Sequence, residues 1–163
     1  MTESATTDIR LPDDKPPELA NSFMRWALTT PGIQSLLGQN LALLSYTGRR
    51  SGREYVTPVS YHRDGDLVTV ITKRQRKWWH NFETPIEVEL RLAGKDYFGK
   101  AEILPDDAET LLFLMDYFRK RPIDAKAYGL EKHEITRERL NALLPHIVVI
   151  RIHVHPVEVP AEL

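Results

Sequence analysis

Two short clusters of basic residues carry the chemistry most visible in this sequence. In the first, at residues 47–52, two glycines and a serine surround a pair of arginines. Such a turn can present backbone N–H groups beside fixed positive charge, and arginine offers paired donors suited to an oxyanion. We therefore interpret the turn as a candidate phosphate or carboxylate site, built from Arg49, Arg50, Ser51 and Gly52. The alternative is a solvated turn with surface arginines.

The second cluster, at residues 73–81, combines cations with two tryptophans. A binding role would place Trp78 or Trp79 beside a planar ring and the cations at an anionic tail; these cations are Lys73, Arg74, Arg76 and Lys77. The plainer interpretation is a charged loop followed by a helix that buries one tryptophan. Cations with aromatic residues also suit single-stranded nucleic acid. The formal net charge of −1 disfavours a nucleic-acid partner, because such proteins are usually basic.

Other catalytic patterns are absent from the sequence. There is no Gly-x-Ser-x-Gly nucleophile motif and no histidine–glutamate pair at zinc spacing on a helix. His153 and His155 would point the same way on a strand, but no third ligand is evident, so we expect no metal site. Hydrolytic chemistry thus lacks visible groups, whereas cofactor redox chemistry needs few side chains.

Length and composition favour one small domain. The chain has 163 residues, no cysteine, and 22 basic against 23 acidic side chains. The absence of cysteine excludes disulfides and fits a reducing compartment. No apolar run approaches the roughly 20 residues needed to cross a bilayer, and the N-terminus has no secretory signal pattern. We expect a cytoplasmic protein without a transmembrane segment.

Hydrophobic periodicity predicts a mainly β protein with helices. A hairpin signal at residues 63–66 lies between the two basic clusters and favours their meeting at one edge of one sheet. We expect strands at residues 41–47, 53–62, 67–72, 86–92, 96–104 and 148–154. We expect helices at residues 17–30, 33–37, 77–83, 108–118 and 135–144, with Asp106 and Glu109 as the start signal of the fourth.

Short antiparallel strands at this spacing indicate a closed or split barrel. The predicted fold class is α+β, with six antiparallel strands in a closed or split β-barrel; of these, the family resemblance given below implies the split β-barrel, like those that bind FMN. We expect a single domain over residues 17–156, between a flexible tail at residues 1–16 and a second tail at residues 157–163.

Residues 41–104 resemble a known family. The matching pieces are the turn 47–52, the strand segment 57–59, the hairpin 61–66, and Trp79 to Phe82 followed by Pro85. Together they resemble the deazaflavin-dependent nitroreductase family, within the split-barrel flavin and deazaflavin oxidoreductases of the pyridoxamine-phosphate-oxidase-like superfamily. The resemblance implies bound coenzyme F420, an 8-hydroxy-5-deazaflavin with a phosphate and an oligoglutamate tail.

The resemblance also implies roles for individual residues. Arg50, Ser51 and Gly52 look like the phosphate turn. The strand against the ring would be formed by Thr57, Pro58 and Val59, and the short helix beside the pocket by Trp79 and Asn81.

The leading hypothesis is an oxidoreductase that passes a hydride from the reduced deazaflavin to a small hydrophobic acceptor, such as a quinone or a nitroaromatic compound. Tyr61 is a candidate catalytic proton donor, with water as the alternative. An FMN-dependent oxidoreductase on the same barrel remains an alternative, as do a haem protein and a non-catalytic module that binds a cofactor or a lipid. A homodimer is compatible with this fold.

Overall fold

The structure is a computed structural model and describes residues 41–157. The predicted helices at residues 17–30 and 33–37, the tail at residues 1–16 and the C-terminal tail from residue 158 lie outside these residues. The described residues contain two compact units, one of strands and one of helices, and each is described by itself. The predicted single domain over residues 17–156 stays a prediction.

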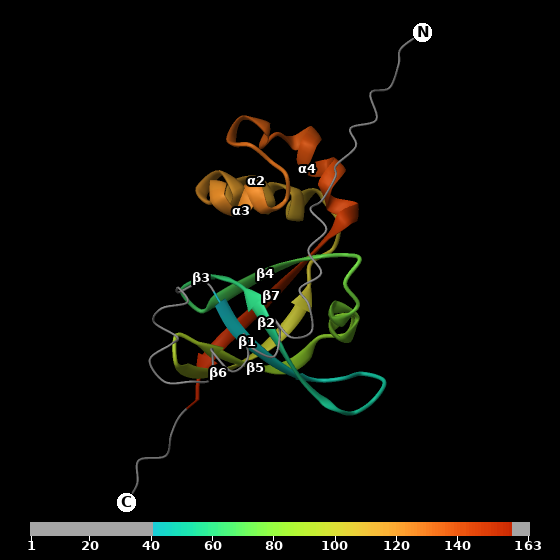
Figure 1. The fold of residues 1–163 in the computed structure, drawn as a ribbon, viewed down its shortest axis with the longest axis vertical. Coiled ribbons are helices and arrows are strands. Elements are labelled where there is room, and N and C mark those ends of the chain that lie inside the picture. The colour runs from blue at the N-terminus through green and yellow to red at the C-terminus, as the bar shows by residue number, and fades with distance from the viewer. Residues whose placement is uncertain (1–40, 158–163) are drawn as a thin grey trace, which may run out of the picture. The chain divides into compact units, whose positions relative to one another are not determined.

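One curled sheet forms the first unit (Figure 1). Its strand order is β2-β1-β5-β6-β7-β4-β3. The pairs β1–β2, β1–β5, β3–β4, β5–β6 and β6–β7 are antiparallel. The strands are β1 (Leu41–Thr47), β2 (Glu54–Ser60), β3 (His62–Asp64), β4 (Leu67–Lys73), β5 (Ile86–Leu92), β6 (Lys95–Ile103) and β7 (Ile147–Pro156). The predicted α+β split barrel is therefore confirmed.

The sheet has seven strands, so the prediction of six was wrong. The expected strand at residues 53–62 divides at Tyr61 into β2, which pairs with β1, and β3, which pairs with β4. Because β2 and β3 are the two edges of the sheet and follow one another directly, the division brings the edges together and curls the sheet. Pro58 lies on the edge strand β2, where its missing N–H costs no ladder bond.

Glycines at two places allow the strands to fold back or to approach closely. Gly65 has a φ of +58° in the β3–β4 hairpin, as the Asp-Gly signal predicts. Gly99 on β6 is different, because a Cβ there would lie 2.5 Å from the carbonyl oxygen of His153. Its pairing with both neighbouring strands is continuous, so Gly99 permits close strand packing and does not form a bulge.

The barrel core follows from alternation along the strands. On β5, Val88, Leu90 and Leu92 are buried, whereas the residues between them are exposed. The buried side chains join those of β1, β4 and β7 and the short 3-10 helix η1 (Trp78–Phe82) in one cluster. Each fully buried Leu, Val or Phe stabilises the fold by roughly 1.5–3 kcal/mol, and this cluster holds η1 against the sheet.

In the second unit, the described residues 104–146 form helices and the segments that connect them. The helices are α2 (Ala108–Lys120), α3 (Pro122–Ala127), η2 (Lys132–Glu134), α4 (Arg137–Leu143) and η3 (Leu144–His146). Helix α2 begins one residue later than the predicted start signal at Asp106 suggests, because the N-cap is Asp107, whose carboxylate accepts the N–H of Thr110 at 2.9 Å. The short helix α3, which begins at Pro122, was not predicted from the sequence. None of the described helices is long and apolar enough to span a membrane.

Candidate anion-binding site

The turn between β1 and β2 is closed by its own backbone. Gly48 N–H donates to Arg53 O at 2.7 Å, and Gly52 N–H donates to Gly48 O at 2.9 Å. Gly52 has a φ of +67°, a conformation that glycine adopts without strain. A Cβ on Gly48 would lie 2.5 Å from the Tyr55 ring. Both glycines predicted in the turn are thus required by its geometry.

Most of the turn's amides are bonded within the protein. Arg49 N–H donates to Asn81 Oδ1 at 2.8 Å, and Arg53 N–H donates to Ser51 Oγ at 3.2 Å. With the two glycine amides also engaged, the N–H groups of Arg50 and Ser51 have no partner within residues 41–157. Two adjacent free amides beside an arginine form a setting that suits an anion.

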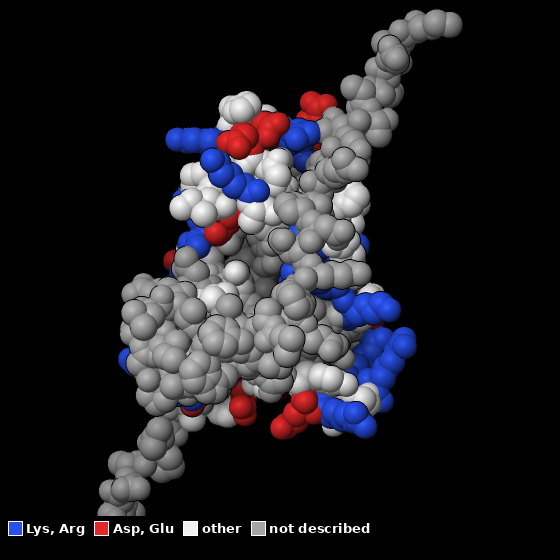
Figure 2. Space-filling model, in the orientation of Figure 1, with Lys and Arg blue, Asp and Glu red and all other residues white. Residues whose placement is uncertain are grey.

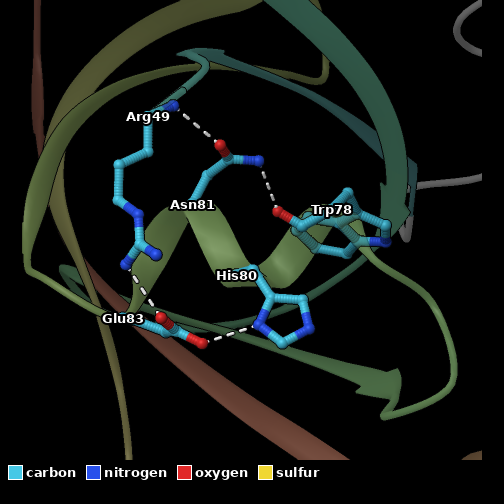
Figure 3. Close-up of polar contacts among 5 residues, drawn as sticks. All are labelled: Arg49, Trp78, His80, Asn81 and Glu83. Atoms are coloured by element: carbon cyan, nitrogen blue, oxygen red, sulfur yellow. Dashed lines mark hydrogen bonds and ion pairs between the residues drawn. The ribbon is translucent and has the colours of Figure 1, made fainter. Parts of the chain in front are cut away.

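Asn81 joins this turn to η1 (Figure 3). Its side-chain oxygen accepts from Arg49 N–H, and its Nδ2 donates to Trp78 O at 2.8 Å. The amide therefore links the two segments that contain the basic clusters, 32 residues apart in sequence. The family resemblance implied a position for Asn81 beside the cofactor pocket, and in the structure Asn81 is one of the residues that line the hollow described below.

A carboxylate also links the same two segments. Glu83 Oε2 accepts from Arg49 Nη1 at 2.8 Å, and Glu83 Oε1 accepts from His80 Nδ1 at 2.6 Å. The hydrogen bonds from His80 and from Arg49 lower the pKa of Glu83, so the carboxylate stays ionised over a wider pH range. Neither His80 nor Glu83 was predicted as a site residue, because Arg49, the residue that connects Glu83 to the turn, lies 34 positions earlier in the sequence.

These residues surround a hollow of about 580 Å³, a volume typical of small-molecule sites. It is lined by Gly48, Arg49, Arg50, Ser51, Tyr55, Lys77, His80, Asn81 and Glu83. Figure 2 shows Lys and Arg side chains gathered on the right of the sheet unit, where the β1–β2 turn and η1 appear in Figure 1. Arg50 and Lys77 are exposed and have no side-chain partner among the described residues.

Aromatic side chains support the turn. Tyr46 stacks on Tyr55 at 5.9 Å between ring centroids and contacts Phe82 edge-on at 5.0 Å. Trp78 contacts Phe82 at 5.8 Å. The Tyr55 hydroxyl lies 3.1 Å from Ser51 Oγ, so this aromatic cluster orients the hydroxyl that sequence analysis assigned to the site. Tyr55 was not predicted as a lining residue.

The second basic cluster does not stay together. Lys77 lines the hollow, whereas Lys73, Arg74 and Arg76 do not. Lys73 is buried, with 5% of its surface exposed. The Arg74 guanidinium lies 5.5 Å from the Trp79 ring centroid, and Trp79 Nε1 donates to Arg74 O at 2.9 Å. Trp79 belongs to the core, so it fits the plainer interpretation of a helix that buries one tryptophan.

The strand segment assigned to the ring also lies outside the hollow. The Thr57 hydroxyl is 3.0 Å from the Tyr46 hydroxyl, Pro58 is half-buried, and Val59 lies in the core. Tyr61 is in the core too, and burial raises the pKa of its hydroxyl. The ring-binding and catalytic roles of these residues stay predictions.

The histidines on β7 offer no metal site. His153 and His155 are exposed, and they lie opposite Lys100 and Phe98 on β6. Within residues 41–157, no group of three or more histidine or acidic side chains could hold a metal ion.

The curled antiparallel sheet places this chain among the split-barrel folds. The family described as F420H(2)-dependent quinone reductase matches residues 23–132, which is more than half of the chain. The chain belongs to this family, so the resemblance to the deazaflavin oxidoreductases is confirmed. A search among curated proteins found no match.

Solved structures are similar at low identity. A protein described as a domain-swapped dimer has a TM-score of 0.51 and 14% identity, covering 80% of this chain and 92% of that chain. HutZ, a heme storage protein from Vibrio cholerae, has a TM-score of 0.49 and 14% identity over 79% of this chain and 90% of its own. A protein described as an F420 reductase has a TM-score of 0.42 and 18% identity over 78% and 96%. These likenesses concern the fold alone.

Proposed function

We propose that this protein is an oxidoreductase that uses reduced coenzyme F420 and passes a hydride to a hydrophobic acceptor, such as a quinone or a nitroaromatic compound. The observation that carries the proposal is the hollow beside the β1–β2 turn, where Arg50 and Lys77 have no partner among the described residues. Membership of the family described as F420H(2)-dependent quinone reductase supports both the cofactor and the quinone class.

The residues of the hollow fit an anionic group. Arg50 and Lys77 supply two positive charges, and the free amides of Arg50 and Ser51 supply two donors on the same wall. The guanidinium of Arg49 is already bound by Glu83, so Arg49 holds the turn in place instead of binding the ligand. We infer that the phosphate or the glutamate tail of the coenzyme binds between Arg50 and Lys77.

When bound, reduced F420 supplies the hydride, and the protein contributes position and exclusion of water. Rigid orientation of two reactants can lower the barrier by roughly 7–11 kcal/mol in the best cases. The β1–β2 turn is fixed at three points, by its own backbone, by Asn81 and by Glu83. An anion held there has a defined distance from the barrel strands, which we propose contact the ring through Thr57, Pro58 and Val59.

A proton must also reach the acceptor after hydride transfer. Tyr61 was the candidate donor, but its burial in the core and its raised pKa make it a weaker acid than a free tyrosine. We therefore propose water as the proton donor. Replacement of Tyr61 by Phe would leave turnover unchanged if water donates, and would reduce it if the hydroxyl does.

One observation favours the FMN alternative. Because Lys73 and Arg74 lie outside the hollow, the site offers fewer cations to a long oligoglutamate tail than the sequence suggested. A ligand with a single phosphate and no tail, such as FMN, needs only the cations that remain.

Titration of the purified protein with oxidised F420 and with FMN separates the two cofactors. We expect saturable F420 binding and quinone-dependent oxidation of reduced F420, with weaker FMN binding. Tight FMN binding without F420 binding would favour the alternative. F420 binding without turnover of any quinone or nitroaromatic acceptor would indicate a non-catalytic cofactor-binding protein.

A further inference from the structure

The strongest unassigned feature of the hollow is His80, whose ring is held on two sides. Its Nδ1 donates to Glu83 Oε1 at 2.6 Å, and the ring stacks on Trp79 at 3.7 Å between centroids, with 27° between the planes. Because Trp79 is itself in the core, the imidazole has a rigid support. The carboxylate and the stacking partner together give this ring a defined direction.

The other ring nitrogen is available to a ligand. An ionised carboxylate only accepts, so Glu83 fixes the proton of the neutral imidazole on Nδ1. No partner of Nε2 occurs within the described part of the chain, and His80 lines the hollow. In the neutral ring Nε2 can only accept a hydrogen bond, whereas in the protonated ring it donates one and carries positive charge.

The charges around His80 favour an anion in the hollow. Glu83 is the acidic residue of its lining, and Arg49 pairs with that carboxylate. Arg50 and Lys77 then leave two positive charges in excess, and protonation of His80 raises the excess to three. Protonation of the imidazole would therefore strengthen the attraction of the hollow for an anion.

We propose that His80 is a further anion-binding residue, oriented by Glu83, which binds the phosphate or carboxylate group held by Arg50 and Lys77 and does so only when its imidazole is protonated. The inference rests on the proposed function for the identity of the natural ligand. It does not need the function for its physical basis, since any multivalent anion in the hollow would meet the same three side chains.

The test compares four proteins at pH 8.0 and pH 5.5: the wild type, His80→Asn, Glu83→Gln and His153→Asn. Asparagine can donate to Glu83 from Nδ2, much as Nδ1 does, but it cannot become charged. His153→Asn is the matched control, because His153 is an exposed histidine on β7 outside the hollow. Equilibrium binding is measured with two probes, oxidised F420 and inorganic pyrophosphate, and thermal unfolding verifies that each variant is folded.

We expect affinity for both probes to increase at pH 5.5, relative to pH 8.0, at least about fivefold more in the wild type than in His80→Asn. His153→Asn should behave like the wild type, and Glu83→Gln should lie between. At pH 8.0 His153→Asn should bind both probes within about twofold of the wild type. The charge of the probe changes equally for all four proteins, so differences between them report on the protein.

Equal pH dependence in the wild type and His80→Asn would overturn the inference. The proposed function fails in a different way, through absence of F420 binding by the wild type at both pH values. In that case the pyrophosphate comparison still decides the role of His80, because pyrophosphate needs only the anion site.

Discussion

The two basic clusters have similar composition but different structural roles. At the β1–β2 turn, most backbone N–H groups are hydrogen-bonded within the protein, and the Arg49 guanidinium is bound by Glu83. Arg50 is exposed and lines the hollow. After β4, the chain packs inward instead, so that Lys73 is buried and Arg74 lies against Trp79. Only Lys77, the last cation of the second cluster, reaches the hollow.

The difference shows that a run of cations does not by itself define an anion site. A turn forces its central residues outward, whereas a segment that ends a buried strand and enters a helix must cover core surface with part of its side chains. Long cationic side chains can do so with their aliphatic parts. We therefore propose ligand binding for the first cluster together with Lys77, and structural support for the rest of the second.

The largest expected effect is a loss of stability when Trp79, which packs beside the second basic cluster, is replaced. Trp79→Ala should destabilise the protein by roughly 3–5 kcal/mol, because it removes a buried aromatic side chain and leaves a cavity. It also removes the surface on which His80 stacks and the partner of Arg74. Urea unfolding measures the loss. The exposed variant Lys77→Ala is the control and should change stability by less than about 0.5 kcal/mol.

The next largest effect is a difference in F420 affinity between variants of the hollow and variants of the second basic cluster outside it. We expect Arg50→Ala with Lys77→Ala to weaken F420 binding about a hundredfold, or roughly 2.8 kcal/mol, because both cations of the hollow without a described partner are lost. Arg74→Ala with Arg76→Ala removes the same formal charge outside the hollow and should weaken binding less than about threefold. A loss of equal size in both double variants, measured by fluorescence titration, would show that the clusters act together.

A smaller effect concerns the link between the turn and η1. Asn81→Ala removes the acceptor of Arg49 N–H and the donor to Trp78 O, and each lost hydrogen bond costs roughly 0.5–1.5 kcal/mol. We expect lower stability and weaker F420 binding together. Asn81→Asp retains the acceptor for Arg49 and loses only the donor, so it should show the smaller loss of the two in urea unfolding. If Asn81→Ala had the stability and the F420 affinity of the wild type, Asn81 would not be part of the site.

The smallest effect is a change in the pH dependence of stability. The pKa of Glu83 lies below the ordinary carboxyl value of 4.5 because His80 and Arg49 bond to the carboxylate. A lowered folded-state pKa gives stability that is present above the unfolded value and is lost as pH falls through the folded value. Urea unfolding between pH 6 and pH 3 should therefore show a shallower loss for Glu83→Gln than for the wild type. Parallel curves would mean that this carboxylate is not engaged in solution.

The fold was predictable wherever local patterns decide it. The strand at residues 41–47, the alternation of β5 and the Asp-Gly hairpin are all present in the structure. The division of the second strand at Tyr61 was not predictable, since it depends on β2 and β3 pairing with different partners. The short helix α3 was missed because six residues give too little periodicity to recognise.

The candidate site was predictable only in part. Residue types and glycine positions identify the β1–β2 turn, because its geometry is local. The contacts of Arg49 with Asn81 and Glu83 join residues 32 and 34 positions apart, and no sequence spacing indicates them. For the same reason the sequence could not distinguish Lys77, which lines the hollow, from the buried Lys73.

The most direct test of the central claim is a crystal structure of the protein with bound F420. We expect the coenzyme phosphate or a tail carboxylate in the hollow, within hydrogen-bond distance of the Arg50 guanidinium, the Ser51 amide and Lys77. Coenzyme whose anionic groups lie on Lys73, Arg74 or Arg76, with the hollow empty, would contradict this expectation.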